Sequence, residues 1–150
     1  MATGLWTDYK ASSFAGGSGT SSSPYQISNA AQLAYMAYLV NSNTTYRNKY
    51  YQLTADIDLS AHYWYPIGKE NYSFNGTFDG QYHTISNMTI DNTVTGMGVK
   101  YLGLFGYIGK YNLTVTIKNL FMNNAMITDS SATYTSFLVG HNGDKLYLNN

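Results

Sequence analysis

The pattern of apolar and polar positions changes once along the chain, from the period of a helix to the period of a strand. Within residues 28–42, apolar residues recur every three or four positions, which places them on one face of a helix. Ser28 or Asn29 can cap this helix by accepting a hydrogen bond from a free N–H of its first turn. We therefore predict one amphipathic helix whose buried face consists of Ala30, Leu33, Ala34, Ala37 and Val40, broadened by Met36 and Leu39.

Downstream of this helix, apolar residues alternate with polar ones. In Leu53–Leu59 the odd-numbered positions are apolar, and the even-numbered ones are Thr54, Asp56 and Asp58. This alternation is typical of a strand with one buried face, so the three polar side chains are expected to point to solvent. No helical pattern of useful length follows, and the rest of the chain is expected to form strands.

A short internal repeat predicts how these strands are arranged. Met88–Asn92, Leu120–Asn124 and Leu146–Asn150 share one order of residue types, and they start 32 and 26 residues apart. A glycine-flanked apolar piece precedes each copy: Gly76–Gly80, Gly103–Gly106 and Phe137–Gly140. Asn87 and Asn119 stand just before the first two copies, and we expect both to adopt the left-handed conformation and to bond backbone groups of the corners.

Strands that recur at this interval, with no helix between them, are typical of stacked coils that share one core. The sequence therefore predicts an all-β fold: a right-handed parallel β-helix (β-solenoid) with one N-terminal capping α-helix. A β-sandwich is the alternative, but its hairpins would need turns every 8–12 residues or so. We expect a single domain with N-terminal strands and a loop at 1–27, the capping helix at 28–42 and the solenoid coils at 43–150.

The order of these motifs resembles the GLUG-repeat proteins, bacterial cell-surface and secreted β-solenoids named for a Gly-Leu-X-Gly repeat. Ser23–Ala34 is similar to the lead-in helix of the family, and Tyr50–Leu59 is similar to its lead-in strand. The resemblance covers residues 14–150 and implies surface display with adhesion-like or substrate-binding roles, without catalytic residues. Family members carry more repeats, so we expect a segment of a longer protein. The other matching stretches are Trp64–Gly68, Phe74–Gly80, His83–Asn87, Gly103–Gly106 and Leu138–Gly143.

Composition argues against several classes of partner. Only 11% of the residues are charged, and eight acids balance eight bases, so no long-range field favours nucleic acid or anionic lipid. The longest apolar stretch, Ala30–Val40, is far shorter than the roughly 20 residues of a membrane span, so no membrane insertion is expected. Asn, Thr, Ser, Gly and 16 Tyr replace the charges, as is typical of extracellular β-rich surfaces. We expect an extracellular or cell-surface location in a bacterium.

The acids and histidines suggest little catalytic chemistry. Glycoside hydrolysis needs two carboxyl groups about 5–10 Å apart, and only Asp56 and Asp58 share an outward face. A polysaccharide-active enzyme, hydrolase or lyase, centred on this pair is the alternative function. The histidines lack a zinc spacing, so no cofactor is expected. The one ion left open is Ca²⁺, which Asp56, Asp58 and Asp79 could hold from neighbouring coils.

Aromatic residues suggest binding instead. Exposed rings can stack on the C–H faces of sugars while phenol groups bond hydroxyls, and the candidates are Tyr63, Tyr65 and Tyr72, whereas Trp64 is expected to fill the core. We therefore expect a non-enzymatic binding, adhesion-like or scaffold module that recognises glycan or protein; a purely structural stalk or cap is a further alternative. The last coil would leave an apolar layer uncovered at Leu146, Tyr147 and Leu148, which predicts self-association or a covering partner.

Overall fold

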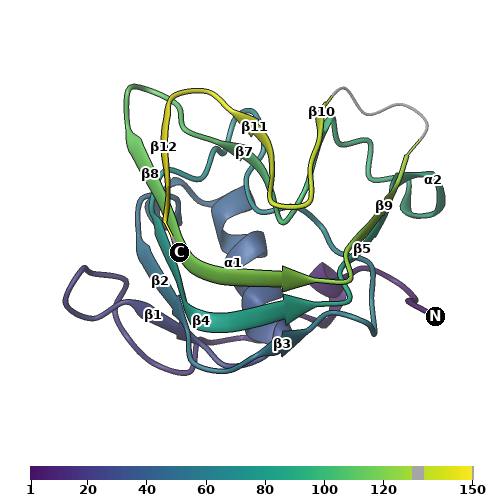
Figure 1. Cartoon of the computed structure of the whole chain (residues 1–150), viewed down its shortest axis with the longest axis horizontal. Helices are drawn as coiled ribbons and strands as arrows, with labels where there is room; N and C mark the ends of the chain where they lie inside the picture. The colour runs from purple at the N-terminus through teal and green to yellow at the C-terminus, as the bar shows by residue number, and fades with distance from the viewer. Residues whose placement is uncertain (130–133, 150) are drawn as a thin grey trace.

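The computed structural model describes residues 1–129 and 134–149, and most of the regular structure in them is strand (Figure 1). The helix α1 has 13 residues, and the other described helical segments are single turns. The helical elements are η1 (Trp6–Tyr9), α1 (Ala30–Ser42), η2 (Thr44–Tyr46) and α2 (Asn92–Thr95). The strands are β1 (Tyr25–Ile27), β2 (Tyr50–Leu53), β3 (Ile57–Asp58), β4 (Thr77–Ser86), β5 (Thr89–Asp91), β6 (Tyr101–Leu102), β7 (Phe105–Ile108), β8 (Thr114–Asn123), β9 (Met126–Thr128), β10 (Tyr134–Thr135), β11 (Val139–Asn142) and β12 (Lys145–Asn149).

Every pairing between these strands is parallel. The largest sheet has the order β1-β2-β4-β8-β12, and β3 also pairs with β4. Three smaller sheets pair β5 with β9, β6 with β10 and β7 with β11. Parallel neighbours need a connection of a dozen or more residues, which is usually a helix; here further strands and loops supply most of these connections. The predicted all-β class with parallel strands is confirmed.

The core consists of side chains that lie in register on successive strands. Tyr51 of β2 lies beside Phe78 of β4, and Phe78 lies beside Ile117 of β8. All three are almost fully buried, so each inward position is covered by its counterpart on the next strand. Burying one such side chain contributes roughly 1.5–3 kcal/mol, which makes these rows the main source of stability.

The helix α1 forms where the apolar stripe predicted it. Asn29 is its N-cap, because its side-chain oxygen accepts a hydrogen bond of 3.0 Å from the backbone N–H of Gln32. The helix contacts η1, η2 and β1, and Figure 1 shows it behind the largest sheet. All seven predicted apolar positions are buried, and Asn41 is buried beside them: the full set is Ala30, Leu33, Ala34, Met36, Ala37, Leu39, Val40 and Asn41.

The segment Leu53–Leu59 is two strands and not one. β2 ends at Leu53 and pairs with the first part of β4, whereas β3 begins at Ile57 and pairs with the last part of β4. The chain turns between them, where the Thr54 backbone N–H donates to the Ile27 oxygen over 2.9 Å. The alternation of burial is nevertheless confirmed, since Thr54, Asp56 and Asp58 are exposed.

Left-handed asparagines mark the corners, as predicted. Asn87, Asn119 and Asn124 have φ values of 58°, 51° and 51°. Their side chains bond mainly to other side chains and not, as expected, to backbone: Asn87 Nδ2 donates to Asp58 Oδ1 at 3.0 Å, and Asn124 Nδ2 donates to Asn87 Oδ1 at 2.7 Å. Asn119 Nδ2 donates to Asp79 Oδ1 at 3.0 Å. Polar side chains therefore connect the same corner of neighbouring repeats.

The predicted register of the repeat is wrong. It places Leu120 beside Met88 and Leu146 beside Leu120, whereas the structure pairs Leu120 with His83 and Leu146 with Val115. The cause is that each repeat carries the apolar-polar-apolar pattern ending in asparagine on more than one of its sides. Sequence similarity alone cannot tell which of these sides lie on top of each other.

Gly68, Gly106 and Gly140 lie beside one another on successive repeats, and they set how closely the backbones approach there. The backbone N–H of Gly106 donates to the Ile67 oxygen at 2.8 Å, and a Cβ on Gly106 would stand 2.6 Å from the oxygen of Gly68. A Cβ on Gly140 would stand 3.0 Å from the Gly106 oxygen. The glycine-flanked piece that matches Gly103–Gly106 is thus the one ending at Gly68, and not Gly76–Gly80 as predicted. These glycines let the backbones approach closely.

Within the described part of the chain, no helix is both long and apolar enough to cross a membrane.

Candidate functional site

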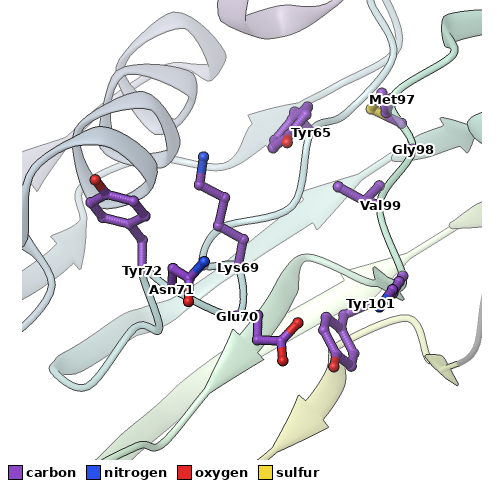
Figure 2. Close-up of a pocket in the computed structure, with 11 residues that line it drawn as sticks. Tyr65, Lys69, Glu70, Asn71, Tyr72, Met97, Gly98, Val99 and Tyr101 are labelled. Atoms are coloured by element: carbon purple, nitrogen blue, oxygen red, sulfur yellow. The ribbon is translucent and has the colours of Figure 1, made fainter.

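A surface pocket of about 350 Å³ lies between two segments that are far apart in sequence (Figure 2). One wall is the segment 65–72, which contributes two tyrosines and charged side chains. The other wall is the loop 97–101, which follows α2 and leads into β6. Its aromatic and charged side chains include Tyr65, Lys69, Glu70, Tyr72 and Tyr101.

Tyr65 is directed to the pocket because its neighbours are held in the core. Trp64 is fully buried, and its Nε1 donates to the Leu104 oxygen at 3.1 Å, so it fills the core as predicted. Pro66 and Ile67 are buried as well, which leaves Tyr65 on the outer side of this extended segment. Burial raises the pKa of the Tyr65 phenol, so its hydroxyl stays protonated at neutral pH and can donate a hydrogen bond.

A tight turn presents the polar groups of the first wall. The backbones of Lys69 and Tyr72 bond each other in both directions, at 2.8 and 3.2 Å, and Glu70 lies at the tip of this turn. The Lys69 Nζ lies 5.1 Å from the centroid of the Tyr72 ring, within the range of a cation–π contact. This turn therefore places a cation beside an aromatic face and a carboxylate one residue further on.

The second wall is held by an excursion of the chain between β5 and β6. The Asp91 carboxylate accepts bonds from the backbone N–H groups of Thr93 and Val94, which starts the one-turn helix α2. Gly96, with φ of 59°, ends it, and Val99 then packs against the core. The chain so returns to the body of the protein directly before Tyr101.

Tyr101 lies opposite Glu70 across the pocket (Figure 2). The pKa of its phenol is raised by burial first, and then by the Glu70 carboxylate and by the neighbouring phenols of Tyr107 and Tyr134. Its hydroxyl is therefore also a hydrogen-bond donor at neutral pH. Together, the pocket offers aromatic faces, neutral hydroxyl donors, the ammonium groups of Lys69 and Lys100 and one carboxylate, which are groups that bind and orient a polar ligand.

The three predicted aromatic candidates do not share one site. Tyr65 and Tyr72 line this pocket, whereas Tyr63 lines a separate hollow with Ser60 and Met126. Reasoning from sequence missed Lys69, Glu70 and Tyr101. Gly68, directly before Lys69 and Glu70, indicates a turn and could have pointed to these two residues. Tyr101 could be placed beside them only with the correct register of the repeats.

The pair proposed for an enzyme is engaged in corner contacts. The Asp56 Oδ1 accepts from the Thr84 backbone N–H at 2.9 Å and lies 3.1 Å from the His83 Nδ1, and these two bonds lower its pKa in that order. The pKa of Asp58 is lowered by the hydrogen bond from Asn87 and then by that from the Ser60 backbone. Both carboxyl groups are ionised at neutral pH, whereas a general acid needs a raised pKa.

The acids expected for calcium bond to different partners. Asp79 forms an ion pair of 3.1 Å with Lys118 and accepts from Asn119, while Asp56 and Asp58 bond as above. In residues 1–129 and 134–149, no group of three or more His, Asp or Glu side chains could hold a metal ion. The calcium hypothesis stays an untested prediction.

The residues proposed for self-association lie on an edge strand. β12 pairs with β8 and ends the order of the largest sheet. Leu148 lies in register with the buried Ile117, yet it is 59% exposed, and Tyr147 is 60% exposed. Leu146 is half-buried. The core row therefore continues into β12, where no further strand is described beside it.

Two curated relatives match the chain. A halomucin of Haloquadratum walsbyi is 35% identical over 124 residues, which are 75% of this chain and 1% of that protein. A protein described as a Gly-rich membrane protein of Evansella cellulosilytica is 33% identical over 136 residues, which are 86% of this chain and 14% of that protein. The chain thus spans only a small part of the length of these relatives. No family model matches the chain, and no solved structure does either.

Proposed function

We propose that the chain is a segment of a right-handed β-solenoid in a bacterial surface or secreted protein, and that it binds glycan without chemical turnover. The solenoid is supported by strands that pair in parallel with a later strand in four sheets, and by corner asparagines that bond their counterparts. The GLUG-repeat resemblance is the family that we propose for it. The names of the relatives, a halomucin and a Gly-rich membrane protein, support a location at the cell surface.

The observation that carries the proposed binding is that three tyrosines line one pocket. Tyr65, Tyr72 and Tyr101 come from two distant segments, and Lys69 and Glu70 stand between them. A sugar ring has an apolar C–H face and a rim of hydroxyl groups, which match aromatic faces surrounded by donors and acceptors. The volume of about 350 Å³ lies at the small end of ligand pockets, which span roughly 300–1,000 Å³.

The pocket offers recognition and no pair of catalytic carboxyl groups. Glu70 is the one acid among the residues that line it, whereas glycoside hydrolysis needs a second carboxyl group across the bond. Lys69 and Lys100 also line the pocket, so its charged side chains are two ammonium groups and one carboxylate. This favours a glycan-binding module over a polysaccharide-active enzyme.

Retention on glycans tests the proposal. The protein would be passed over cellulose, chitin, xylan, polygalacturonate and immobilised host glycans, and affinity for retained polymers would be measured by titration calorimetry. Loss of one stacking ring is worth about 1–1.5 kcal/mol, so Tyr72→Ala and Tyr65→Ala should each weaken binding about five- to tenfold. Tyr82→Ala is the matched control, because this tyrosine is 66% exposed at a bend of β4.

Two results would contradict the proposed function. Absence of retention on every polymer would contradict the proposed function, and so would equal affinities of Tyr72→Ala, Tyr65→Ala and Tyr82→Ala. Binding of a protein through the same pocket, with the glycans inert, would favour the protein-recognition alternative. Each variant would be checked for folding by its thermal unfolding transition.

A further inference from the structure

We infer that the ligand of this site is a polysaccharide chain and not a short sugar, because the pocket continues into a row of aromatic rings on the following repeat. This inference rests on the proposed glycan binding. The rings belong to Tyr101, Tyr107, Tyr134 and His141, which we call the aromatic cluster. Tyr101 belongs to both the pocket and the cluster.

The cluster is built by two register pairs. Tyr101 of β6 lies beside Tyr134 of β10, and their rings are stacked with centroids 5.5 Å apart and an interplanar angle of 16°. Tyr107 of β7 lies beside His141 of β11, with ring centroids 4.7 Å apart. Tyr101 also meets Tyr107 edge to face at 5.1 Å, so the two pairs form one contiguous group.

These rings lie outside the core. Leu102, Phe105 and Ile108 are fully buried on the same strands, whereas Tyr101 and Tyr107 stay partly accessible to solvent. Tyr134 is 46% exposed, and the other three rings are half-buried. The core on these strands is therefore complete without the cluster, and the rings form an outer layer that a ligand can reach.

The direction of the cluster sets the shape of the ligand. Each register pair joins a strand to its counterpart on the next repeat, and neighbouring strands lie about 4.8 Å apart. The cluster therefore extends from the pocket along the direction in which the strands stack. A ligand that contacts both Tyr72 and Tyr134 has to extend beyond the pocket in this direction, which favours a chain of sugar units over a short sugar.

The stacked glycines keep this outer surface in place. Gly68, Gly106 and Gly140 approach each other closely, and Lys69, Tyr107 and His141 each directly follow one of them. The backbone N–H of Tyr107 donates to the Gly68 oxygen at 3.1 Å. The pocket and the cluster are thus attached to one set of tightly spaced strands.

Affinity as a function of ligand length tests the inference. The probes are the disaccharides and hexasaccharides of cellulose, chitin and polygalacturonate, measured by titration calorimetry against the whole chain. For the polymer that binds, the hexasaccharide should bind at least tenfold more tightly than the disaccharide. Tyr134→Ala should weaken the hexasaccharide five- to tenfold and leave the disaccharide unchanged, whereas Tyr72→Ala should weaken both.

Two further variants keep the outcome decisive. Tyr82→Ala removes an exposed tyrosine of β4 that belongs to neither the pocket nor the cluster, and it should change neither affinity. Tyr134→Leu preserves apolar bulk if Tyr134→Ala proves unstable, and it should also weaken the hexasaccharide. Equal affinity for both lengths, or an unchanged hexasaccharide affinity in the Tyr134 variants, would overturn the inference and leave the cluster as packing between strands. Binding of no probe at all would instead refute the proposed function itself.

Discussion

Replacing Gly106 by alanine tests the close stacking on which the candidate site depends. A Cβ at this position would stand 2.6 Å from the Gly68 oxygen, 2.9 Å from the Tyr101 oxygen and 3.0 Å from the Cβ of Pro66. Two of these atoms are backbone oxygens in the segments that flank the pocket. The clash therefore cannot be relieved by rotating a side chain, and the strands must separate.

The expected cost follows from these contacts. Overpacking of a tight interior typically lowers the free energy of unfolding by about 1–3 kcal/mol. Because two of the contacts are with backbone, we expect Gly106→Ala to cost about 2 kcal/mol or more. Any glycine-to-alanine change also stabilises by about 0.4–1 kcal/mol by restricting the unfolded chain. Gly16→Ala is the matched control, because the nearest atom to its added Cβ is the flexible end of the Gln26 side chain at 3.1 Å. The two variants should differ by about 2 kcal/mol in free energy of unfolding.

Urea unfolding followed by the fluorescence of Trp6 and Trp64, which are both buried, measures this difference. For a chain of 150 residues, 2 kcal/mol corresponds to a melting temperature lower by about 4–8 °C. Gly106→Ala should also weaken glycan binding, since Tyr101 would be displaced. Equal stability of Gly106→Ala and Gly16→Ala would refute the close approach of these strands.

Four further predictions concern the corners, the acids and the last strand. Asn87→Ala should lower the free energy of unfolding by about 1–3 kcal/mol, because alanine tolerates the left-handed φ poorly and Asp58 loses a donor; an unchanged urea midpoint would contradict this. Because the pKa of Asp58 is lower in the folded state, its stabilising effect is present above about pH 4 and is lost as the pH falls below that value; acid titration of Asp58→Asn should show a shallower loss, and identical slopes would refute the linkage. Sedimentation velocity should show concentration-dependent self-association that Leu148→Lys abolishes and Val94→Lys, at another exposed apolar residue, preserves; a wild-type monomer at every concentration would argue against it. No polysaccharide should be depolymerised with or without Ca²⁺, and turnover that Asp56→Asn abolishes would establish the enzyme alternative.

The parts of the fold that the sequence predicted are those determined by neighbouring residues. The stripe of α1 and its Asn29 cap need only a window of a few turns, and the left-handed conformation of Asn87 reflects a preference of asparagine itself. The register of the strands could not be predicted from neighbouring residues, because Leu146 and Val115 are 31 residues apart and their pairing is decided by which rows fill the core. Local similarity between strands gave a different alignment.

The same limit applied to the candidate site. Tyr65 and Tyr72 were found because aromatic residues cluster in that stretch of sequence, and the structure places both in one pocket. Tyr63, the third candidate, lies apart from them, since its segment lies beside Leu5 and it lines another hollow. Tyr101 could not be connected to the other two without the correct register of the repeats.

The unequal lengths of the repeats bear on how such a protein can diversify. Along the buried row, Tyr51 follows Tyr25 by 26 residues, Phe78 follows Tyr51 by 27, Ile117 follows Phe78 by 39 and Leu148 follows Ile117 by 31. The longest interval contains α2 and the loop that forms the second wall of the pocket. The buried row is complete without these additional residues, and lengthening a surface loop costs little free energy. Insertions and deletions in this excursion could therefore remodel what the pocket accepts while the stacked strands remain unchanged.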